Sequence, residues 1–398
     1  MKRLIITLCS LLAVCAAIAQ KPKPFDIPDE PAPGTTKPGK PGSKQSGAAA
    51  EIANALAKAA SLRAENAASV SAGGSHTVVV RKDGVALAWG ENASGQLGDA
   101  TSSQSSRPVA IPGGPYAQLA AGASFSVGVK ADGSLWVWGQ QMGGNDGGAK
   151  RAEPRQLPMA AAVTAVAAGG QHALALGTDG SLWAWGGNQF GQVGDGTTVP
   201  RTAPIQIGSG FAKIAAGARH SLAINRDGVL YAWGNNELGQ LGIAGDEGLT
   251  PREVGRDFIA VAAGRNHSLA IKKNGSLWAW GDNQSGQLGD ASGTQQPAPV
   301  KIGADADWTA VAAGSKHSLG IRAGGSLYAW GANDEGQLGN GTNSNAPAPV
   351  KVDGSYALVA AGGYHSVASK TDGSVWVWGA SDRGQAGPGA STRPKAMQ

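Results

Sequence analysis

The dipeptide Trp-Gly recurs seven times in this 398-residue chain, at intervals of 47 to 50 residues. A fixed period of this length indicates that the chain repeats one small unit, which buries its apolar side chains only by packing against further copies. We therefore expect the repeated tryptophans to pack between units and to have a structural role. They are Trp89, Trp138, Trp185, Trp233, Trp280, Trp330 and Trp378.

Each copy carries the pattern of a β-hairpin ahead of its Trp-Gly. In the fourth copy, His220, Leu222 and Ile224 alternate with small residues, which is the period of two that a strand requires. Asp227-Gly228 follows, a dipeptide suited to a tight turn with positive φ. The return strand then leads directly into Trp-Gly, so the first part of every copy predicts two antiparallel strands.

A glycine-rich signature, Gly-Gln-Leu-Gly or a close relative, follows Trp-Gly in six copies, and a proline-led apolar segment such as Pro204-Ile205 ends the unit. No helix pattern follows these glycines, so they are turns and not a phosphate-binding loop. Four short strands in each of seven units predict an all-β, seven-bladed β-propeller of four-stranded blades. We expect the C-terminal segment 392–397 to pair into the sheet of the first copy and so close the ring.

The three motifs AAGxxHSL, DGxLWxWG and NxxGQLG together resemble the repeat family named for the regulator of chromosome condensation, from about Val70 to Gln398. The resemblance implies a seven-bladed propeller. It leaves the function open, because propellers of this family serve as nucleotide-exchange factors, as a light sensor and as a secreted bacterial inhibitor of β-lactamase. The present chain resembles an exported, bacterial-type member.

The N-terminal region predicts export. Residues 1–19 have two basic residues, an apolar run and an Ala-Ile-Ala end, which is typical of a cleaved signal peptide, although an uncleaved anchor or lipidation at Cys15 are alternatives. Residues 20–47 are rich in Pro, Gly and Lys and predict a disordered tether; residues 48–66 predict a short Ala-rich helix, and 67–398 the propeller. We therefore expect a periplasmic, secreted or envelope-associated protein with no membrane span once the leader is removed.

All six histidines occupy one position of the repeat, and Phe125 takes that position in the second copy. They could form a metal site or a proton relay, or each could make the same structural hydrogen bond to backbone groups near a strand start. A catalytic or metal site is built once and not six times, which favours the structural role. The histidines are His76, His172, His220, His267, His317 and His365.

Positions that differ between copies are better candidates for contact with a partner, because they are not needed for packing. The residue before each histidine position varies freely, and so do residues in the turn before Gly-Gln-Leu-Gly. We expect these side chains to surround one face of the ring. The candidates are Ser75, Ser124, Gln171, Arg219, Asn266, Lys316 and Tyr364, with Phe190 and Leu238 in the turns.

The charge balance and the motifs exclude several function classes. The formal net charge is +5, but residues 21–47 carry five lysines against three acidic residues, so the repeats are nearly neutral and do not predict a nucleic-acid binder. No motif of a catalytic, metal or cofactor site is present. We predict a monomeric, non-catalytic propeller that presents a ring face to a protein or cell-envelope partner. The alternatives are a secreted inhibitor of a cell-wall or β-lactamase-type enzyme and, from the family name alone, a guanine-nucleotide exchange factor.

Overall fold

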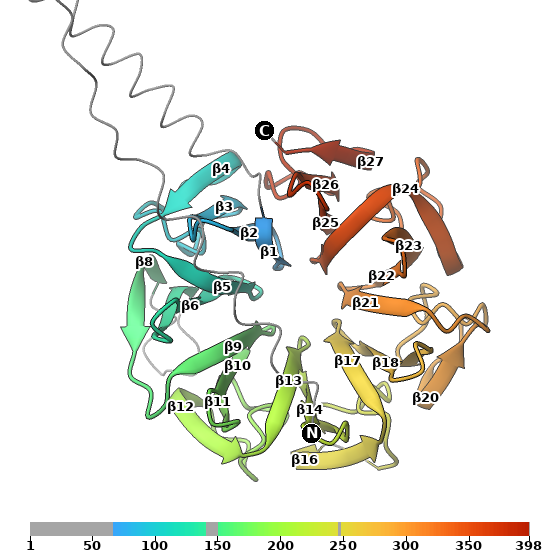
Figure 1. The fold of residues 1–398 in the computed structure, drawn as a ribbon, viewed down its shortest axis with the longest axis horizontal. Helices are drawn as coiled ribbons and strands as arrows, with labels where there is room; N and C mark the ends of the chain where they lie inside the picture. The colour runs from blue at the N-terminus through green and yellow to red at the C-terminus, as the bar shows by residue number, and fades with distance from the viewer. Residues whose placement is uncertain (1–66, 141–149, 246–247, 398) are drawn as a thin grey trace, which may run out of the picture. The chain divides into compact units, whose positions relative to one another are not determined.

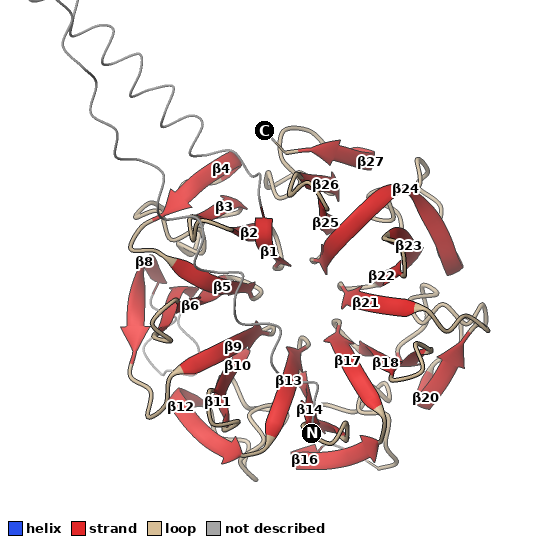
Figure 2. Cartoon of the chain, in the orientation of Figure 1, coloured by secondary structure: helices blue, strands red, loops and turns tan. Residues whose placement is uncertain are grey.

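The computed structural model describes residues 67–140, 150–245 and 248–397. Figure 2 shows strands and loops throughout this part of the chain, with no helix. Accordingly, the described part contains no helical segment with the length and apolar character to cross a membrane. The predicted leader, tether and short helix at 1–66 lie outside the described residues.

The described strands form seven antiparallel four-stranded units, called blades one to seven here. Blades one to four consist of β1 (Ala67–Ala72), β2 (His76–Arg81), β3 (Ala86–Gly90), β4 (Ser105–Ile111); β5 (Tyr116–Ala121), β6 (Phe125–Lys130), β7 (Leu135–Gln140), β8 (Lys150–Leu157); β9 (Val163–Ala168), β10 (His172–Gly177), β11 (Leu182–Gly186), β12 (Arg201–Gly208); and β13 (Phe211–Ala216), β14 (His220–Asn225), β15 (Leu230–Gly234), β16 (Gly248–Gly255).

Blades six and seven share one long strand. β24 runs without a break from blade six, where it pairs with β23, into blade seven, where it pairs with β25. The strands of blades five to seven are β17 (Phe258–Ala263), β18 (His267–Lys272), β19 (Leu277–Gly281), β20 (Gln296–Ile302); β21 (Trp308–Ala313), β22 (His317–Arg322), β23 (Ser326–Gly331), β24 (Ala346–Ala361); and β25 (His365–Lys370), β26 (Val375–Gly379), β27 (Ser391–Ala396).

The hairpin pattern produces the two middle strands of each blade. In blade four, β14 and β15 pair in register from His220 opposite Gly234 to Ile224 opposite Leu230. Gly228 in the connecting turn has a φ of +81°, a conformation that glycine adopts at little cost. The first five residues of β14 are all buried, because each blade is covered on both faces by its neighbours. The all-β, seven-bladed prediction is confirmed.

The blades lie around a central axis, with the first strand of each blade innermost (Figure 1). The innermost strands contact one another in sequence, and β24 contacts β1. Backbone hydrogen bonds link every adjacent pair of blades near the axis: the N–H of Gly74 donates to Gly122 O at 3.0 Å, and the series ends with Gly363 N–H donating to Gly73 O at 3.0 Å. These bonds close the ring.

The expected pairing of the C-terminal segment with the first blade is wrong. β27 pairs with β26 and completes blade seven, while blade one takes all four strands from the first copy. The reason is that the proline-led segment after each Trp-Gly belongs to the same sheet as that Trp-Gly. The last copy therefore has no spare strand, and the ring is closed by contacts between complete blades.

The core lies between blades, and the repeated tryptophans fill it. Trp280 of blade five is fully buried in one cluster with Leu222 and Leu230 of blade four. A Cβ on Gly242, which has a φ of +71°, would lie 2.8 Å from Nε1 of Trp280. The last glycine of the Gly-Gln-Leu-Gly turn therefore makes room for the indole ring of the following blade.

Candidate binding face

The strand order brings two kinds of loop to the same end of the ring. The first strand of a blade runs toward this end and the second leaves it, while the third returns and the fourth leaves again. The Gly-x-x-His loops between the first two strands and the Gly-Gln-Leu-Gly turns between the last two strands therefore share one face, which we call the loop face. The Asp-Gly hairpins lie at the opposite end.

The backbone of the loop face is held in the same way in all seven blades. The carbonyl oxygen of the residue before each histidine position accepts a hydrogen bond from the N–H of the residue after Trp-Gly. The N···O distance is 2.8 Å from Glu91 to Ser75, 2.6 Å from Gly187 to Gln171 and 2.9 Å from Ala380 to Tyr364. Because the backbone is fixed, the side chains at this position are free to differ.

The structure places the candidate partner residues on this face with different degrees of exposure. Gln171, Arg219 and Tyr364 are exposed, Tyr364 by 44%. The other six are partly buried: Ser75, Ser124, Asn266, Lys316, Phe190 and Leu238. The turn of blade three and the loop of blade four meet where the guanidinium of Arg219 lies 4.6 Å from the centre of the Phe190 ring.

A cavity of about 250 Å³ lies at the axis and is lined by the Ala-Gly dipeptide at the end of each innermost strand and by the residue after each glycine. Most of its lining residues are Gly or Ala. The exceptions are Arg265, which is exposed, and Ser315, and they belong to adjacent blades. Sequence reasoning missed both residues. The signal was available, because the position two residues before the histidine position is Gly or Ala in five blades and Arg or Ser in the other two.

Each of the six histidines bonds a hydroxyl group of the next blade, whereas the structural interpretation predicted bonds to neighbouring backbone groups near a strand start. His220 Nε2 lies 2.9 Å from Ser268 Oγ of the next blade, and Ser268 Oγ donates to Gln240 O at 2.8 Å. Because a carbonyl oxygen only accepts, the serine must receive its other hydrogen bond from a protonated Nε2. At the boundary between blades seven and one, His365 Nε2 bonds Thr77 Oγ1 at 3.0 Å.

Burial keeps these imidazoles neutral. Desolvation lowers the pKa of His76, His172 and His317 to about 4, and desolvation assisted by neighbouring histidines lowers the pKa of His220 to about 3. Within the described residues, no three His, Cys, Asp or Glu side chains are grouped as a metal site requires. The described geometry is that of a neutral hydrogen-bonded belt between blades.

One boundary departs from this belt. Between blades two and three, Phe125 stands where the other blades have histidine, and Ala173 stands where they have serine or threonine. Both side chains are buried in the same apolar cluster. Trp185 Nε1 of blade three is buried without an acceptor in the described part of the chain, whereas Trp233 Nε1 donates to Gln192 O at 3.0 Å. This boundary is formed by the second copy, in which the Gly-Gln-Leu-Gly sequence is replaced, and the third copy.

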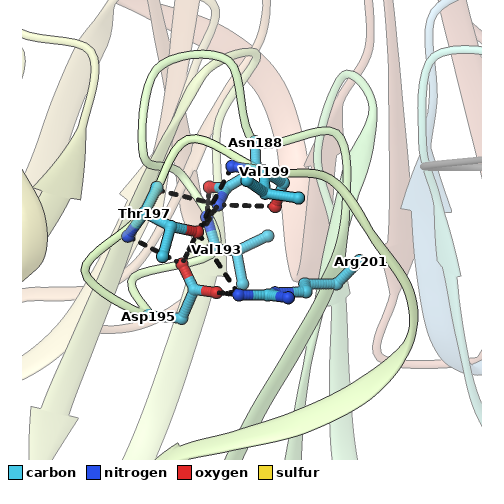
Figure 3. A network of polar contacts seen from close by, with 6 residues as sticks. All are labelled: Asn188, Val193, Asp195, Thr197, Val199 and Arg201. Atoms are coloured by element: carbon cyan, nitrogen blue, oxygen red, sulfur yellow. Dashed lines mark hydrogen bonds and ion pairs between the residues drawn. The ribbon is translucent and has the colours of Figure 1, made fainter.

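A buried asparagine fixes the long loop after Trp-Gly (Figure 3). Asn188 Nδ2 donates to Asp195 Oδ1 at 3.1 Å and to the carbonyl oxygens of Thr197 and Val199 at 2.9 and 3.0 Å. Partial burial opposes ionisation of Asp195, but hydrogen bonds from Thr197 and Arg201 outweigh it and lower the pKa of the carboxyl group. Asn92, Asn283 and Asn333 make corresponding contacts in other blades. The network explains how a long loop keeps a defined shape on the loop face.

The family follows from this fold together with a comparison of sequences. A model described as the RCC1-like domain matches residues 38–254 and 162–398, which together cover most of the chain. The chain belongs to the RCC1-like domain family. The resemblance to the regulator of chromosome condensation is thereby confirmed.

Solved structures agree with the assignment to RCC1-like propellers. Yeast RCC1 (Prp20) bound to Kap60 has a TM-score of 0.71 and 24% identity, covering 78% of this chain and 83% of that chain. Prp20p from Saccharomyces cerevisiae has a TM-score of 0.68 and 25% identity, covering 80% and 83%. Human WBSCR16 has a TM-score of 0.70 and 21% identity, covering 79% and 94%. No curated protein matches the sequence.

Proposed function

We propose that this RCC1-like propeller is an exported, non-catalytic binding module that recognises a protein or cell-envelope partner through its loop face. The observation that carries the proposal is the contrast between backbone and side chains on this face. Hydrogen bonds of 2.6 to 2.9 Å hold the backbone of all seven loops alike, while the residue before the histidine position is of six different types, with only serine repeated, in blades one and two. A rigid scaffold with varied loop side chains is the usual form of a recognition surface.

The family supports a binding role. RCC1-like propellers generally serve as binding or exchange-factor scaffolds and not as catalysts. The similar Prp20p structure is described together with its binding to Gsp1p and histones, and yeast RCC1 is described bound to Kap60. Those partners belong to those proteins. For this chain, the leader-like residues 1–19 support a partner outside the cytosol.

Site-specific photocrosslinking tests the proposal. The full chain, expressed in its native cell, carries p-benzoyl-phenylalanine in place of Tyr364 on the loop face. The matched control carries the same residue in place of Lys273, which is exposed in the Asp-Gly-type hairpin at the opposite end of the ring. We expect one envelope or exported protein to crosslink at position 364 and not at 273, and to bind the purified chain directly.

Two results would contradict the proposal. Equal crosslinking at both positions, or none at position 364, would remove the loop face as the recognition surface. Cell fractionation that found an uncleaved chain in the cytosol would remove the export route and favour the exchange-factor alternative.

A further inference from the structure

We propose that the loop face binds an acidic segment of its partner protein, and that one carboxylate of this segment enters the axial cavity and meets Arg265. This inference rests on the proposed function, because it specifies the chemistry of the partner that the loop face recognises. It is carried by the distribution of charge around the cavity and by the chemistry of the cavity lining.

Positive charge is concentrated on one side of the cavity. The two residues between glycine and the histidine position give fourteen positions in seven blades, and these contain three cations and no acid. The cations are Arg219, Arg265 and Lys316, which come from the consecutive blades four, five and six. Among the described residues, none of these three side chains forms an ion pair. The corresponding positions of blades one to three are neutral, so the positive field is directional.

The cavity itself is suited to a single carboxylate. Its Gly and Ala lining leaves space at the axis. Backbone N–H groups at the mouth of the cavity already donate hydrogen bonds to carbonyl oxygens of the next blade, as Arg265 N–H does to Gly314 O at 3.1 Å. A ligand in the cavity must therefore be recognised by side chains. Arg265 offers a guanidinium that can bind a carboxylate with two hydrogen bonds, and Ser315 of the next blade offers a hydroxyl donor.

Acidic residues farther from the axis limit the size of the positive zone. The turns before Gly-Gln-Leu-Gly expose Glu237, Asp334 and Glu335, and they also expose Asp382, which forms a 3.5 Å ion pair with the exposed Arg383. These turns lie toward the rim, because a Cβ on Gly239 would lie 2.6 Å from Pro297 of the outermost strand β20. A long polyanion such as a nucleic acid would cross this acidic border and be repelled. A protruding acidic loop or tail would place its charge only at the centre.

One acidic residue lies next to these loops but is largely buried. Asp282 lies beside the loop of blade five, since its N–H donates to Asn266 O at 2.9 Å. Its side chain is 7% exposed, and one carboxylate oxygen accepts a hydrogen bond from Gln284 N–H at 3.1 Å. Tyr364, on the same face, adds an exposed aromatic ring that can pack against the apolar part of a bound segment.

Fluorescence anisotropy with defined probes tests the inference on the full chain. The first probe is a fluorescein-labelled 15-residue Gly-Ser peptide with four central acidic residues, and the second replaces them by Asn and Gln. The third is a 15-nucleotide single-stranded DNA, and phosphatidylglycerol vesicles in a flotation assay are the fourth. The variant is R265Q/K316Q. Its matched control, R155Q/K301Q, removes two exposed cations from the outer strands β8 and β20.

We expect the chain to bind the acidic peptide and not its amide counterpart, with an affinity that falls as salt rises. The R265Q/K316Q variant should lose about tenfold in affinity, as the loss of two charge pairs at the surface predicts, and R155Q/K301Q should lose none. Failure of the chain to bind the peptide, equal losses in the two variants, or tighter Arg265-dependent binding of the DNA or the vesicles would overturn the inference.

The outcome is separable from that of the proposed function. If position 364 captures a partner whose affinity is the same for R265Q/K316Q and the unmodified chain, the acidic-segment inference fails and the proposed function stands. If the peptide binds through Arg265 and Lys316 but position 364 captures no partner in the cell, the charge chemistry stands and the proposed function fails.

Discussion

Phe125 and Ala173 lie in one buried apolar cluster at the boundary between blades two and three, where the other six boundaries each join a histidine to a hydroxyl. A phenylalanine or an alanine alone in a regular boundary would leave a buried polar group without its hydrogen-bond partner. This would lower the free energy of unfolding by about 1–3 kcal/mol. Both partners have changed here together. The belt is therefore built from matched pairs, and one pair is apolar.

A double-mutant cycle at this boundary tests the pairing. F125H alone buries an imidazole opposite a methyl group, and A173S alone buries a hydroxyl opposite a phenyl ring, so each should lower the free energy of unfolding. In F125H/A173S the two polar groups can bond each other. We expect the double variant to be about 1 kcal/mol more stable than the sum of the single effects predicts, measured by urea unfolding.

The reverse exchange provides the matched control. H220F/S268A converts a regular boundary into the apolar type and should show coupling of the same sign, because the 2.9 Å hydrogen bond between the two side chains is lost only once. Additive effects in both cycles would show that the residues at this position pack independently.

Stability should fall as the solution becomes acidic. The folded pKa values of the six histidines lie at about 3 to 4 because of burial, whereas the unfolded value is near 6.5. Their contribution to stability is fully present above pH 6.5 and is lost as the pH falls from there toward the folded pKa values of about 3 to 4. Each histidine lowers the free energy of unfolding by about 1 kcal/mol per pH unit within this window.

Urea unfolding between pH 7.5 and 5.5 measures this effect before most carboxyl groups titrate. We expect the slope of stability against pH near 5.5 to correspond to the uptake of about six protons on unfolding. A variant that lacks one histidine, H267F/S318A, should take up one proton fewer. A flat profile, or the same slope in both proteins, would show that the imidazoles are protonated in the folded state.

Asn188 should be important for the shape of the loop in blade three. N188A removes the side-chain amide that donates to Asp195, Thr197 and Val199 and the carbonyl that accepts from Val193 N–H at 2.9 Å. We expect a loss of about 1–3 kcal/mol in unfolding free energy and faster amide hydrogen exchange in residues 193–199. Q189A, at the exposed neighbouring position, should change neither quantity, and equal exchange in the two variants would refute the role.

The repeat could be predicted from the sequence because its period reports packing. The spacing of Trp-Gly, the Asp-Gly turn and the alternation around His220 each reflect one local requirement, and together they specify the blade. The sequence also predicted that the residues before the histidine positions lie on one face, which the strand order places them on, while their role in binding stays a prediction. The predicted pairing of the C-terminal segment with the first blade was wrong, because a repeat period alone does not show at which residue a blade begins.

Other features depend on distances between blades, which no local pattern contains. The pairing of His365 with Thr77 joins residues 288 positions apart. The location of Arg265 on the axial cavity, and the isolation of its charge, depend on how the ring brings seven loops together. Recognition chemistry of this kind is visible only when the ring is assembled.

Met397 should connect the last blade to the first although β27 pairs only within blade seven. Its side chain is 6% exposed and lies in one cluster with Val79, Leu87 and Trp89 of blade one, and its N–H donates to Val375 O at 2.8 Å. M397A should therefore lower the free energy of unfolding by about 2–3 kcal/mol, since a large-to-small change leaves a cavity at the ring closure. R393A removes an exposed side chain that forms a 3.7 Å ion pair with Asp353, and it should change the free energy of unfolding by less than about 0.5 kcal/mol. Similar chemical-denaturation midpoints for the two variants would mean that the ring is held closed by the backbone bonds near the axis without help from this contact.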